Sequence, residues 1–206
     1  LGLLQQSKLL STLDITIHCV VQSTIPELAH LLDAVQLKTD KLEKLVLRGT
    51  IASEMVAELC TSCPLTFLQQ LEISNYIEFS IPEGIPAMRS LQVLELENCS
   101  NLDFASVVKN SVELRKVDFF QVSFSNGMDP IPSHKIQELS IVRAGNDVVG
   151  PVLRQATKLV KLTLSYVDDI DFNFSLTGLL ELTLCYCTLS QSLNLKQFHK
   201  LKKVNM

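Results

Sequence analysis

The sequence predicts an α/β solenoid, with a parallel sheet of about nine strands on one side and short helices and turns on the other. The first observation is a pattern of three large apolar residues, Leu-x-x-Leu-x-Leu, that recurs nine times along the 206 residues. The second is the spacing of these copies, which start 20 to 32 residues apart. A period in this range is typical of solenoids, whose repeats stack because none buries its apolar face alone. We therefore expect one domain over residues 1–206, and we interpret the chain as part of a longer protein.

The nine copies define the predicted strands. Apolar residues stand at offsets 0, 3 and 5 from the start of each copy, and all 27 positions hold a large apolar side chain although the chain is 47% hydrophobic. Successive strand residues face opposite sides, so offsets 3 and 5 should be buried while offsets 4 and 6 face solvent. The copies start at Leu10, Leu42, Leu68, Leu91, Leu114, Ile136, Leu159, Leu179 and Leu201.

The segments that return the chain from one strand to the next predict short helices where they are long enough. In the longest one, Thr24 suits a helix cap and Pro26 falls in the first helical turn. Segments rich in proline or glycine, or very short, have room for a turn only. The expected helices are 25–37, 53–63, 104–111 and 147–157, and the expected turns are 82–88 and 172–178.

The repeated pattern resembles the leucine-rich repeat over essentially the whole chain. Extracellular members of this superfamily commonly carry Asn at offset 8, whereas none of the eight offset-8 positions here holds Asn. The stretch LQVLELENCSNLD, with Cys99 at that offset, resembles the cysteine-containing variety of F-box/LRR substrate receptors. Similar irregular repeats occur in intracellular NLR-type receptors. The resemblance implies a horseshoe whose concave sheet is used for recognition.

Composition narrows the function classes. The net charge is −4, and no run of Lys and Arg marks a nucleic-acid interface. No apolar stretch approaches the roughly 18 residues that suggest a membrane-spanning helix. The six cysteines are scattered over a long chain, which favours free thiols in a reducing compartment. We therefore expect a cytoplasmic protein that neither binds nucleic acid nor spans a membrane.

No catalytic or metal-binding constellation stands out. The pairs Cys60/Cys63 and Cys185/Cys187 lie about five repeats apart, too far to share the four ligands of a structural zinc site. The four histidines fall in different repeats, and the sequence has no phosphate-binding glycine loop and no HExxH. We therefore expect no enzymatic activity, no cofactor and no metal.

The outward strand positions are the candidate binding surface. Glu72, Glu95 and Asp118 share offset 4 in consecutive repeats, so they should form a ladder of like charge spaced by about 4.8 Å. A surface that keeps such a ladder suits a protein partner with a basic segment. An apolar and aromatic strip should follow, and Tyr and Arg are favoured interface anchors. The predicted partner-binding residues are Glu72, Glu95, Glu97, Asp118, Phe120, Val142, Arg143, Tyr166 and Tyr186.

Together these observations predict a non-catalytic module that binds a protein partner through its inner sheet. The resemblance offers two settings, the sensor region of an NLR-type innate immune receptor and the substrate-recognition region of an F-box ubiquitin-ligase receptor. The alternative is an extracellular receptor ectodomain. It predicts cysteine-rich caps and Asn at offset 8, which the sequence lacks, and glycans at the sequons of Asn98 and Asn173. The oligomeric state and the identity of the partner stay open.

Overall fold

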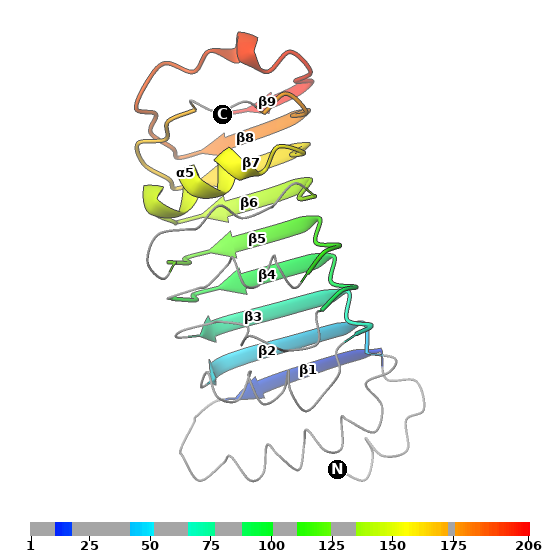
Figure 1. Ribbon diagram of the computed structural model, residues 1–206. Helices are drawn as coiled ribbons and strands as arrows, with labels where there is room; N and C mark the ends of the chain where they lie inside the picture. The colour runs from blue at the N-terminus through cyan, green and yellow to red at the C-terminus, as the bar shows by residue number, and fades with distance from the viewer. Residues whose placement is uncertain are drawn as a thin grey trace, which may run out of the picture.

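The described part of the molecule is a parallel-sheet solenoid. The computed structural model describes residues 11–17, 42–51, 66–76, 88–100, 111–124, 135–172 and 176–206. Their strands form one sheet in the order β1 to β9, in which each strand pairs in parallel with the next one along the chain (Figure 1). Since every neighbour in the sheet is also a neighbour in the sequence, the prediction of a stacked repeat architecture is confirmed.

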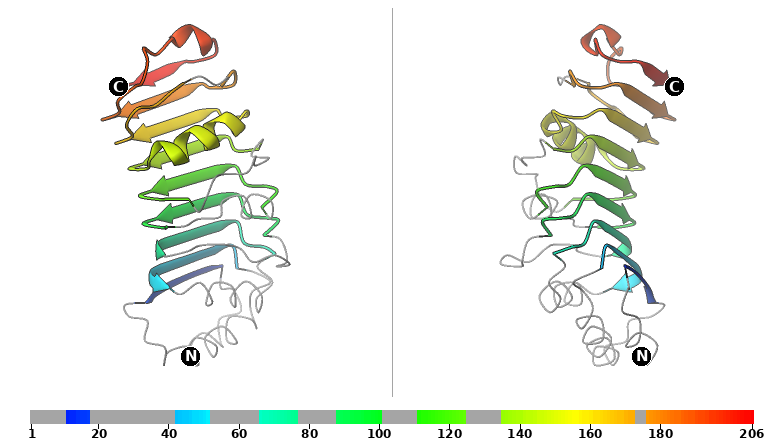
Figure 2. Two further views of the ribbon diagram at one scale, coloured as in Figure 1. Left: turned by 60° about the vertical axis from the view of Figure 1, so that its left-hand side comes forward. Right: turned by 90° about the vertical axis from the view of Figure 1, so that its right-hand side faces the viewer.

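Every strand begins at offset 2 of its repeat. The strands thus coincide with the predicted copies, and most of them end one residue past the last apolar position of the repeat. Figure 2 shows the strands stacked along one side of the molecule. Their bounds are β1 Thr12–Ile17, β2 Lys44–Ile51, β3 Gln70–Tyr76, β4 Val93–Glu97, β5 Lys116–Phe120, β6 Glu138–Val142, β7 Lys161–Ser165, β8 Glu181–Cys185 and β9 Lys203–Asn205.

The core is a continuous column of the apolar positions of successive repeats. In β4, Leu94 and Leu96 are buried, whereas Glu95 between them is half-buried and Glu97 is exposed. The same alternation recurs in β5 to β8, as the two-residue period of a strand requires. One cluster of buried side chains runs from Leu42 to Phe198, so each repeat buries its apolar face against its neighbours.

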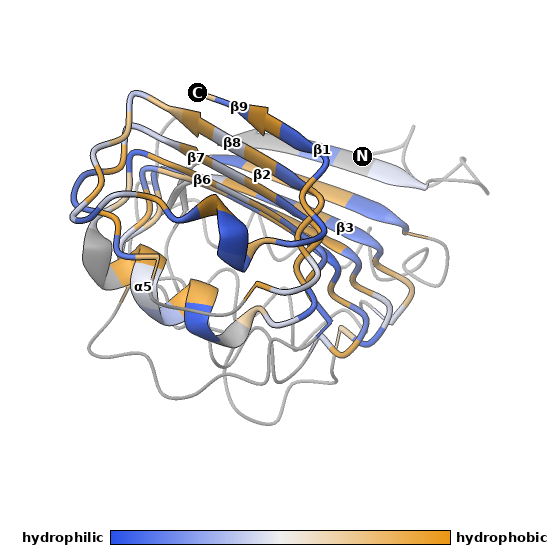
Figure 3. Ribbon diagram, turned by 90° about the horizontal axis from the view of Figure 1, so that it is seen from above, coloured by the Kyte–Doolittle hydropathy of each residue, from blue (hydrophilic) through white to orange (hydrophobic). Residues whose placement is uncertain are grey.

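A helix closes the side of the core opposite the sheet. Helix α5, Asn146–Gln155, lies on the opposite side of the core from the strands (Figure 3). It buries Val148, Val149, Val152 and Leu153, which recur at the spacing of one helical face. It confirms the helix expected over 147–157. The helices expected over 25–37, 53–63 and 104–111 lie outside the described residues, apart from Ser111. So does most of the turn expected over 82–88, whereas a turn is present at the end of 172–178.

A short 3-10 helix, η3, was not anticipated. It spans Leu195–Gln197, and the side chain of Asn194 accepts a hydrogen bond from the backbone N–H of Lys196 at 3.2 Å. This is the bond that caps the free N–H groups at the start of a helix. Three residues are too few for an apolar period to reveal, which explains why the sequence pattern did not predict the element.

Left-handed residues at offset 7 turn the chain off the sheet. Gly49 has a φ of 109°, and Asn98, Gln121, Arg143, Tyr166 and Tyr186 have φ between 51° and 54°. Four of these residues donate their backbone N–H to the last carbonyl of the next strand, for example Asn98 to Phe120 at 2.8 Å and Tyr166 to Cys185 at 2.9 Å. The same bend is thus repeated and hydrogen-bonded along the solenoid.

Cysteine at offset 8 serves as a small buried donor. Cys99 is 1% exposed, and its Sγ lies 3.7 Å from the carbonyl oxygen of Ile73 on the preceding strand. Cys187 repeats the arrangement with Leu164 at 3.4 Å, although it is only partly buried. Together with Cys185, these cysteines are free thiols, as predicted. The remaining three cysteines, at 19, 60 and 63, lie outside the described residues.

Candidate functional site

The outward side chains of the sheet, at offsets 2, 4 and 6, and the exposed side chains at the adjoining offset 7 form a surface that we call the open face. Strand pairing aligns equal offsets, so residues that share an offset form a row across the strands. Glu72 on β3 lies opposite Glu95 on β4, which in turn lies opposite Asp118 on β5. We call these three carboxylates the acidic ladder, and they lie in one row as their spacing predicts.

Lysines at offset 2 neutralise much of the acidic ladder. The ammonium of Lys44 pairs with Glu72, and that of Lys116 lies 2.7 Å from the Asp118 carboxylate and 3.6 Å from that of Glu95. The expected ladder of like charge is thus present, but two lysines that were not predicted to meet it balance part of its charge. Offsets 2 and 4 point to the same face of a strand, so the lysines were placed to pair with the carboxylates and the sequence contained the signal.

The pairing raises the proton affinity of Lys116. Its hydrogen bond to Asp118 raises the pKa of the ammonium above its ordinary value, although partial burial opposes this effect. The charges of Asp118, Glu95 and Glu138 act in the same direction as the hydrogen bond. The ammonium is therefore charged at neutral pH and balances the ladder there.

Arg48 bridges strands at the other end of the ladder. Its Nη1 donates to both carboxylate oxygens of Asp14, at 2.8 and 2.6 Å, and its Nη2 lies 3.9 Å from Glu72. The hydrogen bond with Asp14 raises the pKa of the Arg48 guanidinium. Val46 sits at an outward offset between these two carboxylates but is only 3% exposed. The burial of Val46 corrects the exposure expected at that outward offset.

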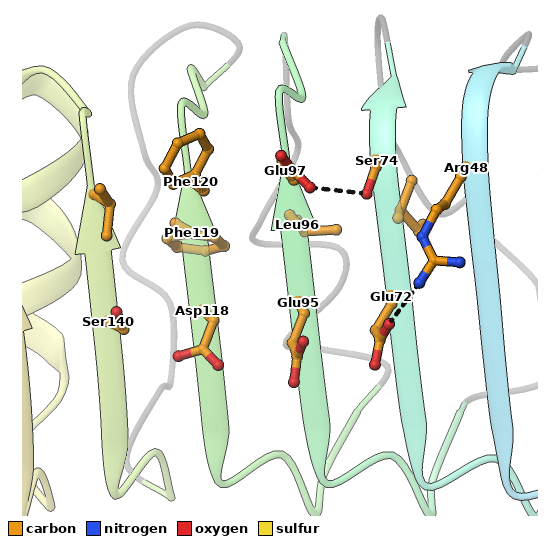
Figure 4. Close-up of a pocket in the computed structure, with 12 residues that line it drawn as sticks. Arg48, Glu72, Ser74, Glu95, Leu96, Glu97, Asp118, Phe119, Phe120 and Ser140 are labelled. Carbon is orange, nitrogen blue, oxygen red and sulfur yellow. Dashed lines mark hydrogen bonds and ion pairs between the residues drawn. The ribbon is translucent and has the colours of Figure 1, made fainter.

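A hollow of about 410 Å³ opens on the face between β2 and β6 (Figure 4). Because each of the five strands contributes one to three residues, the hollow gathers residues far apart in the sequence. It brings together six of the nine predicted partner-binding residues: Glu72, Glu95, Glu97, Asp118, Phe120 and Val142. Arg48, Ser74 and Ser140 also line it and were not predicted, although their outward offsets could have identified them.

Glu97 differs from the other carboxylates of the hollow. It is exposed, and its carboxylate accepts a hydrogen bond from the Ser74 hydroxyl at 3.2 Å. No Lys, Arg or His in the described part of the chain lies within ion-pair distance of it, whereas Glu72, Glu95 and Asp118 all have a basic partner. Strand pairing places Glu97 beside Phe120, as Figure 4 shows. Glu97 is thus a carboxylate of the hollow that is left to attract an external cation.

Three predicted residues lie beyond the hollow, and Arg143 connects them to the Phe120 wall. The guanidinium carbon of Arg143 lies 5.8 Å from the ring centroid of Phe120 and 5.1 Å from that of Tyr166. Tyr166 in turn stacks on Tyr186, with ring centroids 4.8 Å apart and 15° between the ring planes. We call Phe120, Arg143, Tyr166 and Tyr186 the aromatic row, and Phe120 joins it to the hollow.

Arg143, Tyr166 and Tyr186 of the aromatic row are exposed, and their backbone is strained. Tyr166 is 48% exposed and Tyr186 is 78% exposed, values that are high for large aromatic side chains. Arg143, Tyr166 and Tyr186 occupy the left-handed position at offset 7, where a residue other than Gly costs about 1 to 2 kcal/mol. Glycine or Asn would suit this backbone better. Large side chains that persist at strained, exposed positions often serve binding.

The remaining chemistry of the described residues is sparse. No group of three or more His, Cys, Asp or Glu side chains in the described ranges has the geometry to hold a metal ion. The Cys60/Cys63 pair, His18, His30 and His134 lie outside those ranges, while His199 lies in an exposed turn. No helix in the described segments is both long and apolar enough to cross a bilayer.

Comparison with known proteins assigns no family to the chain. No protein-family model matches it, and a search of curated proteins finds no significant match. The function therefore has to be argued from the geometry of the open face.

Proposed function

We propose that this chain is a leucine-rich repeat domain that binds a protein partner through the open face of its sheet, without catalysis. The observation that carries the proposal is the continuity of the hollow with the aromatic row. Together they bring all nine predicted residues into one surface, with carboxylates at one end and exposed tyrosines and an arginine at the other. Such a mixture of aromatic and charged groups is typical of the anchors of protein interfaces.

The repeat pattern supports the identity of the domain. Strands begin at offset 2 of each leucine pattern, and a bend with a left-handed residue follows at offset 7 in six of the repeats. Solenoids of this kind present an extended sheet on which a partner contacts several repeats at once. We place the domain in the cytoplasm, in a setting such as an NLR-type sensor or an F-box substrate receptor. The free thiols and the lack of Asn at offset 8 favour this over an extracellular ectodomain.

A comparative capture experiment tests the proposal. The wild-type chain, an open-face variant and a matched control variant are immobilised, and proteins retained from a cell extract are identified by mass spectrometry. The open-face variant carries Glu97→Lys, Tyr166→Ala and Tyr186→Ala, which change exposed side chains without breaking an ion pair of the acidic ladder. The control carries Arg154→Glu and Lys158→Glu, exposed on α5 and the turn after it.

The proposal predicts that a protein retained by the wild type is lost by the open-face variant and kept by the control. Circular dichroism first establishes that the three proteins are equally folded. Retention that depends on Arg154 and Lys158 and ignores the open-face changes would place recognition on the helical side and overturn the proposal.

A further inference from the structure

We infer that the hollow selects its protein partner by one arginine side chain, whose guanidinium stacks on Phe120 and pairs with Glu97. The inference rests on the proposed function and specifies the partner's chemistry. Instead of a general attraction for a basic segment, the hollow would provide a site for one planar cation. Three independent observations carry it: the charge balance of the hollow, the position of Glu97 beside an aromatic ring, and a guanidinium that the protein already holds on the same row of rings.

Charge balance identifies Glu97 as the attracting group. The acidic ladder already holds Lys44, Lys116 and Arg48, so a further cation placed there would have to displace an existing one. Glu97 accepts only the Ser74 hydroxyl among the contacts described above. Arg48 lies two strands away, and its shortest contacts are with Asp14. A cation that enters the hollow therefore gains most beside Glu97.

The wall next to Glu97 favours a guanidinium over an ammonium. Phe120 is the direct strand neighbour of Glu97, and Val142 is the neighbour of Phe120 on the next strand, so an apolar surface adjoins the carboxylate. A guanidinium is planar, more weakly hydrated than an ammonium, stacks on aromatic faces and meets a carboxylate through two parallel hydrogen bonds. An ammonium gains less from the ring and loses more hydration.

Arg143 provides an example of the same recognition within the molecule. Its guanidinium lies between the rings of Phe120 and Tyr166, at 5.8 and 5.1 Å from their centroids, while Lys44 and Lys116 pair with carboxylates. The row thus already contains one ring–guanidinium–ring arrangement. An arginine of the partner on the Glu97 side of Phe120 would add a second guanidinium to this row of rings. That guanidinium would pair with the Glu97 carboxylate.

NMR titration of the isotope-labelled chain with small probes tests the inference. The probes are the Nα-acetyl amides of arginine, lysine and citrulline, the last being a neutral analogue of arginine with nearly the same shape. We expect saturable shifts of the backbone amides around Glu97 and Phe120 with arginine, weaker binding of lysine and no binding of citrulline. Comparable binding of citrulline, or shifts centred elsewhere, would overturn the inference.

Matched variants make the test specific. Glu97→Gln should weaken arginine binding roughly tenfold, the effect expected for a lost hydrogen bond between charged groups. Glu138→Gln makes the same change on the same face outside the hollow and should leave the affinity unchanged. Phe120→Leu keeps an apolar wall without the ring and should abolish the preference for arginine over lysine. Unchanged signals from β7 to β9 verify that each variant is folded, and equal weakening by the two glutamine variants would contradict the site.

Failure of this inference is distinguishable from failure of the proposed function. If the open-face variant loses its captured protein while the arginine probe does not bind near Glu97, the surface works through other chemistry and the inference falls alone. If capture ignores the open face altogether, the proposed function falls first.

Discussion

Lys44 and Lys116 change the meaning of the carboxylates next to them. Three acidic residues in one row suggested a surface of like charge that suits a basic partner. The pairing of Lys116 with Asp118 and Glu95 instead balances much of that charge within the protein. Exposed ion pairs of this kind contribute about 0 to 1 kcal/mol each to the free energy of unfolding. Their larger effect is to determine which carboxylates keep an unbalanced charge. At the residue scale, Glu97 is therefore the carboxylate whose charge stays available to a partner.

Strain at offset 7 leads to a prediction about Gln121. This residue has a φ of 52° and an exposed side chain. Gln121→Gly removes the steric cost of the left-handed backbone, and it should raise the free energy of unfolding by about 0.5 to 1 kcal/mol after the larger loss of chain entropy is subtracted. Gln137→Gly, in an exposed position without positive φ, should lower it by a similar amount. Urea denaturation of the two variants checks the opposite signs; destabilisation by both would show that offset 7 carries no strain.

The ion pairs of Glu113 lead to a prediction about pH. Hydrogen bonding to Lys135, reinforced by its charge and by Arg115, lowers the pKa of Glu113 below its ordinary value of about 4.5. A carboxyl whose pKa is lower in the folded state stabilises the protein above its unfolded pKa and loses that effect as pH falls through the folded pKa. Glu113→Gln should therefore lower the melting temperature at pH 6 and have a diminishing effect as the pH falls below 4.5. A difference that is constant over this pH range would mean that the pairs do not form.

The strands were more predictable than the side-chain pairs that they carry. Apolar residues at offsets 3 and 5 predict a strand because burial depends on one property of one residue, and a strand occurs at each of the nine copies. The expected burial at these offsets holds in β2 to β8, whereas Val204 and Met206 in the last copy are exposed. Pairs such as Arg48 with Asp14 depend on how far a long side chain reaches across strands, which spacing does not determine. Helix α5 was predictable because four buried residues fall on one face, whereas η3 is too short to show a period.

The register of β4 leads to a prediction about Leu94, which is 0% exposed and is the second residue of the strand. Leu94→Ala should lower the free energy of unfolding by about 2 to 5 kcal/mol, because it removes buried methyl groups and leaves a cavity between repeats. Val93→Ala changes the half-buried neighbour that faces the other way, and it should cost clearly less. A larger loss for Val93→Ala than for Leu94→Ala in chemical denaturation would mean that the strand faces the other way.

On the scale of the whole molecule, the stacked strands bring residues from five repeats into one hollow. The aromatic row adjoins that hollow at Phe120. No residue of the hollow is distinctive in its own repeat, since the surface exists only when β2 to β6 are aligned. The sequence therefore predicted which positions face outward, but not which of them would meet. The volume of the hollow and the unpaired state of Glu97 among the described residues required the structure.

Site-specific photocrosslinking tests the central claim, that the open face binds a protein, most directly. A benzophenone amino acid replaces Tyr186, the most exposed ring of the aromatic row, or Arg154 on α5. Each folded protein is irradiated in cell extract, and covalent adducts are identified by mass. The account predicts a discrete adduct from position 186 that is absent from position 154. Adducts only from position 154, or the same adducts from both positions, would contradict it.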